Sequence, residues 1–199
     1  MKLLRILLSF ALLSISSMAL AQSETHKPAA QPSAPKSDAQ KSFDKLKTLA
    51  GTWEGRGTTN PPVPDMPDMM QVDLQVASSG NVLKHEMMGA PKAGSAGGKD
   101  ADHPVTMLYL EGDRLLLTHY CDAGNRPRMA ARVSPDGNTV EFDFVDVSGN
   151  TKHGHMDHAV FTIIDANHHT EDWTYLMPGD KPMHAHIDLR RVNQQTAAR

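Results

Sequence analysis

The sequence predicts an all-β protein: a single up-and-down antiparallel β-barrel of about ten strands that follows a short N-terminal helix. Apolar and polar residues alternate in successive runs of about six to ten residues, which is the period-two pattern of half-buried strands. Short sequences rich in Gly, Asn and Asp separate these runs, as they do in antiparallel hairpins. A closed barrel has no edge strands that invite aggregation, so we expect a barrel rather than a sandwich.

Residues 1–21 have the pattern of a secretory signal peptide. Lys2 and Arg5 precede an apolar run over residues 6–13, and small residues follow, ending in Ala19-Leu20-Ala21. The apolar run is much shorter than the ~20 residues that cross a membrane as a helix. We therefore expect the protein to be exported, with a signal peptide that is removed, no membrane span, and a mature protein that is periplasmic or secreted.

The rest of the chain reads as one domain between two flexible segments. Residues 22–40 are mostly Pro, Ala, Ser, Gln and Lys, which bury too little apolar surface to offset the entropy of ordering them. Residues 41–193 have the usual length of one domain with one core. We expect 22–40 to be a flexible linker and 194–199 a disordered tail.

Charge and cysteine content exclude two classes of protein. The formal net charge is −3, and loss of Lys2 and Arg5 with the signal peptide makes it −5, so we expect no nucleic-acid partner. Cys121 is the only cysteine, so an intramolecular disulfide cannot form even in an oxidising compartment. The fold must therefore be stabilised by its core.

A short helix is expected first. Phe43, Leu46 and Leu49 have helical spacing, Ser42 or Asp44 is suited to cap the N-terminus, and Gly51 stops the helix. The strand that follows, Gly51-Thr52-Trp53-Glu54-Gly55-Arg56-Gly57, has glycines that allow a sharp bend or a close crossing, and Trp53 is expected to plug the closed end of the barrel.

The later strands are predicted from alternation and from the turns between them. The period-two sets are Leu83-His85-Met87, Met107-Tyr109, Leu115-Leu117-His119-Cys121, Val140-Phe142-Phe144, Ala159-Phe161-Ile163, Trp173-Tyr175-Met177 and Ala185-Ile187-Leu189. The predicted turns are 79–81, 111–113, 135–138, 148–150 and 178–180, with a further hairpin turn over Asn125 to Arg128. Two longer loops, 60–68 and 89–102, are expected to flank the open mouth of the barrel.

These features together resemble the calycin superfamily, which includes lipocalins, fatty-acid-binding proteins and nitrobindin-like barrels. The similarity is carried by the helix, the Gly51–Gly57 motif, the number of strands and a terminal strand that ends Leu189-Arg190-Arg191. The resemblance implies a barrel cavity for an apolar ligand. Nitrobindin-like members further imply haem held by a histidine near the C-terminus, and His184 or His186 would be the match here.

His184 and His186 also suggest a metal site on geometric grounds. Residues two apart on a strand project to the same side about 7 Å apart, so both imidazoles could approach one metal ion. If Ala185 and Ile187 face the cavity, however, the two histidines point to solvent. Methionine and histidine side chains together suit copper(I) and copper(II), whereas core filling also explains most of the methionines.

The segment around His119 predicts a polar patch inside the barrel. His119 and Cys121 share a face with Leu115 and Leu117, and a neutral imidazole in the interior needs a partner. His85, which is predicted to face inward, is one candidate partner, beside Tyr109 or Asp146. The patch either orients a ligand or is a satisfied core histidine, and both interpretations stay open.

Two carboxylate pairs are expected to lie on the solvent face. They are Glu141 with Asp143 and Glu171 with Asp172, which alternate with apolar positions along their strands. A Cys121–His119 nucleophile is disfavoured because residues two apart on one strand are held several Å apart.

The function predicted from these observations is binding of a small apolar or amphipathic molecule in the barrel cavity, without catalysis. The expected cavity residues are Trp53, His85, Tyr109, His119, Cys121, Phe142, Phe144 and Trp173. One alternative is a haem or copper protein that uses His184 and His186. Others are a structural or interaction module with a filled barrel, and an esterase or isomerase on the same barrel.

Overall fold

The computed structural model describes residues 35–63, 69–89 and 103–192. These residues form one α-helix, one 3-10 turn and ten strands. The elements are α1 (Asp38–Lys47), β1 (Gly51–Asn60), β2 (Met69–Ala77), η1 (Ser78–Gly80), β3 (Val82–Gly89), β4 (Val105–Glu111), β5 (Arg114–Tyr120), β6 (Arg126–Val133), β7 (Thr139–Ser148), β8 (His155–Asp165), β9 (His168–Met177) and β10 (Lys181–Arg191).

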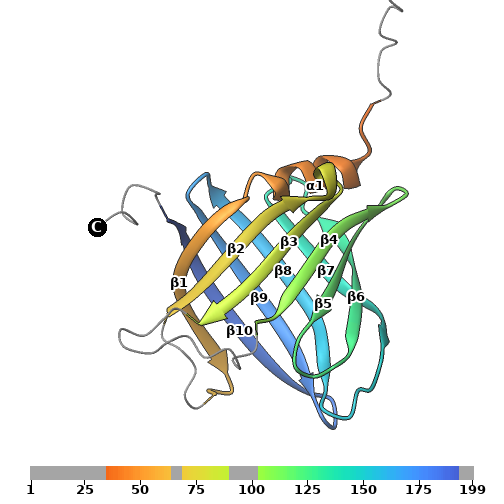
Figure 1. The fold of residues 1–199 in the computed structure, drawn as a ribbon, viewed down its shortest axis with the longest axis vertical. Helices are drawn as coiled ribbons and strands as arrows, with labels where there is room; N and C mark the ends of the chain where they lie inside the picture. Colours follow the sequence, from red (N-terminus) through yellow and green to blue (C-terminus); the bar gives the residue numbers. More distant parts are fainter. Residues whose placement is uncertain (1–34, 64–68, 90–102, 193–199) are drawn as a thin grey trace, which may run out of the picture. The chain divides into compact units, whose positions relative to one another are not determined.

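The ten strands form one closed antiparallel barrel (Figure 1). Each strand pairs with its neighbours in the sequence, and β1 pairs with β10 to close the ring. Closure brings the backbones of these two strands very close: a Cβ added to Gly55 would lie 1.7 Å from the carbonyl oxygen of Asp188. A residue without a side chain is therefore required at this crossing. The predicted fold class is confirmed.

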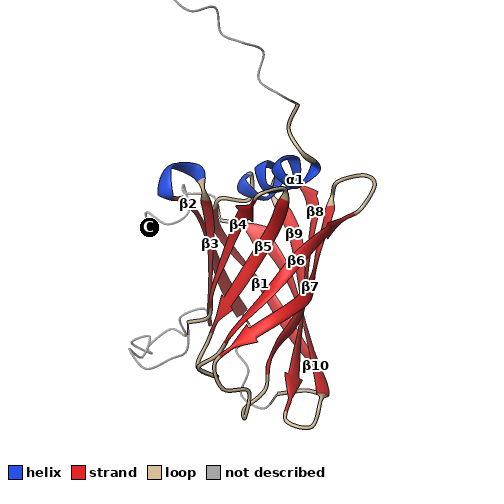
Figure 2. Cartoon of the chain, turned by 90° about the vertical axis from the view of Figure 1, so that its right-hand side faces the viewer, coloured by secondary structure: helices blue, strands red, loops and turns tan. Residues whose placement is uncertain are grey.

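α1 lies across the end of the barrel where β1 begins (Figure 2). Phe43 and Leu46 are buried beneath it, as their spacing predicted. The helix begins earlier than predicted: the hydroxyl of Ser37, not a side chain at 42 or 44, accepts a hydrogen bond from the backbone N–H of Gln40 (3.2 Å). Residues 38–40 are thus helical rather than part of the linker.

Trp53 fills the space under α1 and is fully buried. Its Nε1–H donates to the carbonyl of Leu49 (2.7 Å), and the guanidinium of Arg191 lies 4.1 Å from the centre of its ring. Arg191 also donates to the carbonyls of Thr48 and Ala50, which follow the helix. The helix, β1 and β10 are thereby joined at one end of the barrel.

Alternation predicted the inward face correctly on most strands. The buried apolar core comprises Phe43, Leu46, Leu49, Trp53, Met70, Val72, Leu74, Leu83, Leu108, Leu115, Leu117, Met129, Val140, Phe142, Ala159, Phe161, Ile163, Trp173, Ile187 and Leu189. On β4 the prediction is wrong: Leu108 lies in the core, whereas Met107 and Tyr109 occupy the opposite face. Both faces of this strand carry large apolar residues, so the pattern does not fix which one is inside.

The predicted turn over Asn125 to Arg128 is also wrong. The chain turns at Cys121–Gly124, where the N–H of Gly124 donates to the carbonyl of Cys121 (3.1 Å), and β6 begins at Arg126. Arg128 lies opposite Asp146 of β7 and forms an exposed ion pair with it.

Several predictions concern residues outside the described part of the chain. The signal peptide, most of the linker, the tail after residue 192, and residues 64–68 and 90–102 of the two long loops are among them. Among the described residues, the only helix is too short and too polar to cross a membrane.

Candidate functional site

A cavity of about 290 Å³ lies among interior side chains at the end of the barrel away from α1. Met156 and Met183, at the starts of β8 and β10, mark this end, because α1 lies where β10 finishes. The cavity walls are His85, Met87, Pro104, Thr106, His119, Cys121, Asp122, Met156, Trp173, Tyr175, Met183, Ala185 and Ile187. A mostly apolar wall with a few polar groups is typical of small-molecule sites.

Two histidines flank a threonine in a row across three neighbouring strands. Thr106 of β4 lies opposite His85 of β3 on one side and opposite His119 of β5 on the other. Directly opposed residues share a face of the sheet, so all three side chains are on the interior face. The hydroxyl of Thr106 and Nδ1 of His119 are hydrogen bonded at 2.9 Å. Both imidazoles in this row line the cavity.

A buried carboxylate, Glu171 of β9, lies beside the cavity and is surrounded by N–H donors. His85 Nε2 is 2.9 Å and 3.2 Å from its two oxygens. His169 Nε2 and Trp173 Nε1 each lie 3.0 Å from one of them. Glu171 has no solvent-exposed surface. Three nitrogen donors therefore replace the water that this carboxylate has lost.

The surroundings of Glu171 keep it ionised. Burial acts to raise the pKa of its carboxyl, but the charge of His85 and the hydrogen bonds with His169 and His85 act in the opposite direction. Together they outweigh burial, and the pKa of Glu171 lies well below its usual value. The interior of the barrel therefore holds a fixed negative charge next to histidine.

His119 is held in its neutral form. The pKa of His119 is lowered to about 4, mainly because the ring is buried and secondly because His85 repels its charged form. Its ring also lies 5.7 Å from the ring of Trp173, measured between centroids. At neutral pH the cavity thus contains an uncharged imidazole that is oriented by Thr106 through one nitrogen.

Two buried imidazole nitrogens have no hydrogen-bond partner among the described residues. They are Nδ1 of His85 and Nδ1 of His169, the ring atoms remote from Glu171. His169 packs edge-on against Trp53, with ring centroids 4.2 Å apart, and so belongs to the plugged end of the barrel. His85 instead borders the cavity.

The structure brings four of the eight predicted cavity residues together: His85, His119, Cys121 and Trp173 line the cavity. The other four lie elsewhere. Trp53 and Phe142 are fully buried in the core.

Tyr109 and Phe144 are placed differently from the expectation. Tyr109 lies on the outer face of β4, and its hydroxyl is 3.1 Å from the Thr118 hydroxyl. Phe144 is 38% exposed near the open end of the barrel, with its ring 4.9 Å from the His155 ring. Neither side chain borders the cavity, because β4 has the opposite phase and Phe144 lies on the exposed part of β7.

His184 and His186 lie on the outer face of β10, whereas Met183 and Ala185 line the cavity. His184 Nδ1 bonds the hydroxyl of Thr174 (3.1 Å), and His186 Nδ1 lies 2.6 Å from a carboxylate oxygen of Asp172. These two residues do not fit a haem held inside the barrel. Metal binding by them stays a prediction, and it would place the ion outside the cavity.

Glu171 is the residue that sequence reasoning missed, since it was expected on the solvent face. Trp173 was predicted to face inward, and Glu171 and His169 lie two and four residues before it on the same strand. They must therefore share its face. This two-residue spacing from Trp173 indicated an inward position for Glu171. The solvent face was expected instead because charged residues are rarely fully buried unless they are paired.

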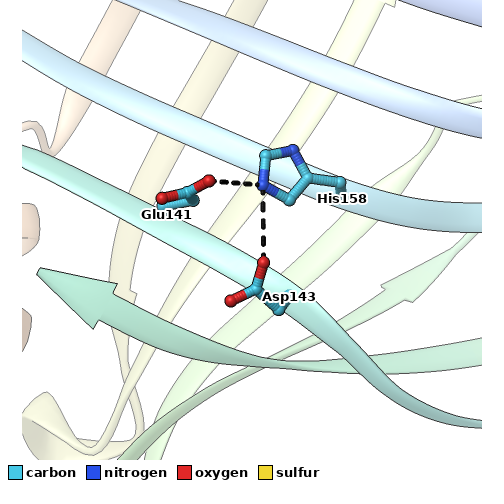
Figure 3. A group of neighbouring side chains, drawn as sticks. All are labelled: Glu141, Asp143 and His158. Carbon is cyan, nitrogen blue, oxygen red and sulfur yellow. Dashed lines mark hydrogen bonds and ion pairs between the residues drawn. The ribbon is translucent and has the colours of Figure 1, made fainter.

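A second group of polar residues lies on the outer face of β7 and β8 (Figure 3). His158 Nε2 is 3.0 Å from an oxygen of Glu141 and 3.7 Å from one of Asp143. The guanidinium of Arg132 forms ion pairs with both carboxylates. This arginine already balances the acidic charge, so the group is an outer-face ion-pair network.

No protein-family model and no curated protein matches the chain. Among solved structures, the chain is similar to the crystal structure of Rv2717c from M. tuberculosis, with 15% identity and a TM-score of 0.55 over 76% of this chain and 98% of that one. A protein of unknown function from the DUF3598 family of Nostoc punctiforme has 11% identity and a TM-score of 0.45, over 74% of this chain and 49% of that one. A redesigned β-barrel has 14% identity and a TM-score of 0.36, over 74% and 94%. The similarity to Rv2717c supports the fold alone.

Proposed function

We propose that this protein is exported and binds a small, largely apolar molecule in the cavity at the open end of its barrel. The observation that carries the proposal is the cavity itself, in which an apolar wall is combined with two oriented imidazoles, those of His85 and His119. A barrel filled with side chains, as a purely structural module would have, would not leave this space. The resemblance to ligand-carrying calycins supports the same assignment.

The size and polarity of the cavity support a particular class of ligand. The cavity volume is about 290 Å³, which about ten water molecules occupy in the liquid. A ligand of about ten to fifteen non-hydrogen atoms would therefore fit. Neutral His119 offers an uncharged nitrogen, Nε2, to one polar group of that ligand. An aromatic compound of one to three rings with one hydroxyl or amino group has these properties.

The proposal includes export and leaves out catalysis. Export is supported by the charged, apolar and small-residue pattern of residues 1–21. Binding without reaction is supported by the spacing of Cys121 and His119 in the sequence, because the Cα atoms of residues two apart in an extended chain are about 7 Å apart, which does not favour a thiol–imidazole pair.

Binding of 1-aminoanthracene, a small fluorescent aromatic amine, tests the proposal. We expect saturable binding of one molecule per chain. Substitution Ala185→Phe fills the cavity with a ring and should weaken binding at least tenfold. Ala130→Phe is the matched control, because Ala130 lies opposite Asp143 on the outer face. No saturable binding, or equal binding by both variants, would disprove a ligand cavity.

A further inference from the structure

The wall of the cavity is rich in soft metal ligands. Three thioethers, from Met87, Met156 and Met183, line it together with the imidazoles of His85 and His119. Thioether sulfur selects copper(I) among the common metal ions, and imidazole accepts copper as well, whereas calcium and magnesium need oxygen ligands. The donor set of this cavity therefore favours a soft monovalent ion.

Two of the thioethers and the two imidazoles lie on opposite walls of the barrel. Met156 of β8 and Met183 of β10 both lie opposite Tyr175 of β9, in a row that matches the His85–Thr106–His119 row centred on β4. In the closed ring of ten strands, β4 and β9 are five strands apart in either direction. The sulfur row and the nitrogen row therefore face each other across the same cavity.

The two walls are close enough to act together. The ring of Trp173, on β9, lies 5.6 Å from the His85 ring and 5.7 Å from the His119 ring, between centroids. Methionine is flexible, with three rotatable bonds, and adapts its sulfur position to a nearby group. Since Met156, Met183, His85 and His119 all line one cavity, an ion bound there would border donors from both walls.

His85 has the environment of a metal-ligating histidine. Its Nε2 is held by the carboxylate of Glu171, and its Nδ1 is buried without a hydrogen-bond partner among the described residues; the side chain as a whole lines the cavity. Ligating histidines usually have this arrangement, in which a carboxylate fixes one ring nitrogen and the other binds the ion. An unpartnered buried nitrogen is otherwise costly, and a bound ion would account for it.

We propose that the cavity binds one copper(I) ion between the imidazoles of His85 and His119 and the thioethers of Met156 and Met183. The site goes beyond the proposed ligand function, because it requires no apolar molecule. Any proton on Nδ1 of His85 is released to solvent when the ion binds, and Glu171 continues to accept the Nε2 proton. The metal does not change oxidation state in this step.

The test uses the mature full-length chain freed of metal. Silver(I), a redox-inert analogue of copper(I), is titrated and followed by native mass spectrometry. Copper(I) affinity is then measured anaerobically by competition with bicinchoninate. We expect one ion of either metal per chain, which an excess of zinc(II) does not displace. X-ray absorption should show both sulfur and nitrogen ligands.

The decisive variant is the double substitution Met156→Leu with Met183→Leu, which removes both sulfurs and nearly conserves side-chain volume. It should weaken copper(I) binding at least tenfold without changing the circular dichroism spectrum. Met69→Leu is the matched control, because Met69 is exposed and does not line the cavity. His119→Gln should also weaken binding, whereas His186→Gln on the outer face should not.

Three outcomes would overturn the site. They are binding of less than one ion per chain, unchanged affinity in the double variant, and a loss on His186→Gln as large as that on His119→Gln. None of these bears on the small-molecule proposal, which is measured with 1-aminoanthracene on metal-free protein.

Discussion

Glu171 and His85 meet inside the barrel although 86 residues separate them in the chain, and His85 Nε2 lies within 3.2 Å of both carboxylate oxygens. The two strands that carry them, β3 and β9, are not neighbours in the ring. This contact therefore crosses the barrel and joins its two walls.

Replacing Glu171 with Gln should destabilise the protein strongly. The amide has one acceptor oxygen instead of two and presents N–H groups to the donors around it, so we expect a loss of about 3–5 kcal/mol in the free energy of unfolding, measured in urea. Asp172→Asn is the control: its exposed pair with His186 should contribute less than about 1 kcal/mol. Equal losses in the two variants would show that the buried network adds no stability.

His119 should make stability depend on pH in mildly acidic solution. Its pKa is about 4 in the folded protein and near 6.5 when unfolded, so the unfolded chain binds more protons between these values. This contribution to stability is complete above about pH 6.5 and is lost as the pH falls to about 4, and it amounts to about 3 kcal/mol. Unfolding curves of metal-free protein at several pH values measure it.

His119→Asn is the comparison for that pH series, since an amide can keep the hydrogen bond with Thr106 but does not titrate. The variant should show a shallower fall in stability between pH 6.5 and pH 4 than the original protein. Parallel curves would contradict the assignment to His119.

Gly55→Ala should disrupt closure of the barrel. The new methyl group would meet the backbone oxygen of Asp188 at 1.7 Å, so β1 and β10 would have to separate, with an expected loss of at least about 3 kcal/mol. Gly112→Ala is the control: its φ of +59° is unfavourable for alanine, but no atom lies within 4 Å of the added Cβ, and the loss should be about 1 kcal/mol. Similar thermal midpoints for the two variants would argue against a tight crossing.

Arg191→Lys should weaken the joint between α1 and the barrel. Lysine keeps the charge but cannot donate to Thr48, Ala50 and Ala166 at once while covering Trp53, so we expect a loss of about 2 kcal/mol in urea unfolding. Arg190→Lys changes an exposed neighbour and should have almost no effect. The assignment fails if the two substitutions are equally mild.

The barrel could be predicted from the sequence because alternation and turns are local signals. Alternation also predicted that His85 and His119 face inward. It failed on β4, where Leu108 and Tyr109 are both large and apolar, so the phase of the strand is ambiguous.

The partner of His85 could not be predicted in the same way. Contact between His85 and Glu171 depends on which strands face each other across the closed ring, and no local pattern specifies this. The outward direction of His184 and His186, by contrast, follows directly from the inward direction of Ala185 and Ile187.

The pairing of β1 with β10 has a consequence for synthesis. β10 is made after the other nine strands of the barrel, and it supplies both the partner of β1 and, through Arg191, the hydrogen bonds that hold the end of α1. A nascent or truncated chain that stops before Lys181 leaves β1 and β9 with unpaired edges, which can add strands from other molecules. The eleven-residue strand β10 thus separates a closed barrel from a fragment with two exposed strand edges.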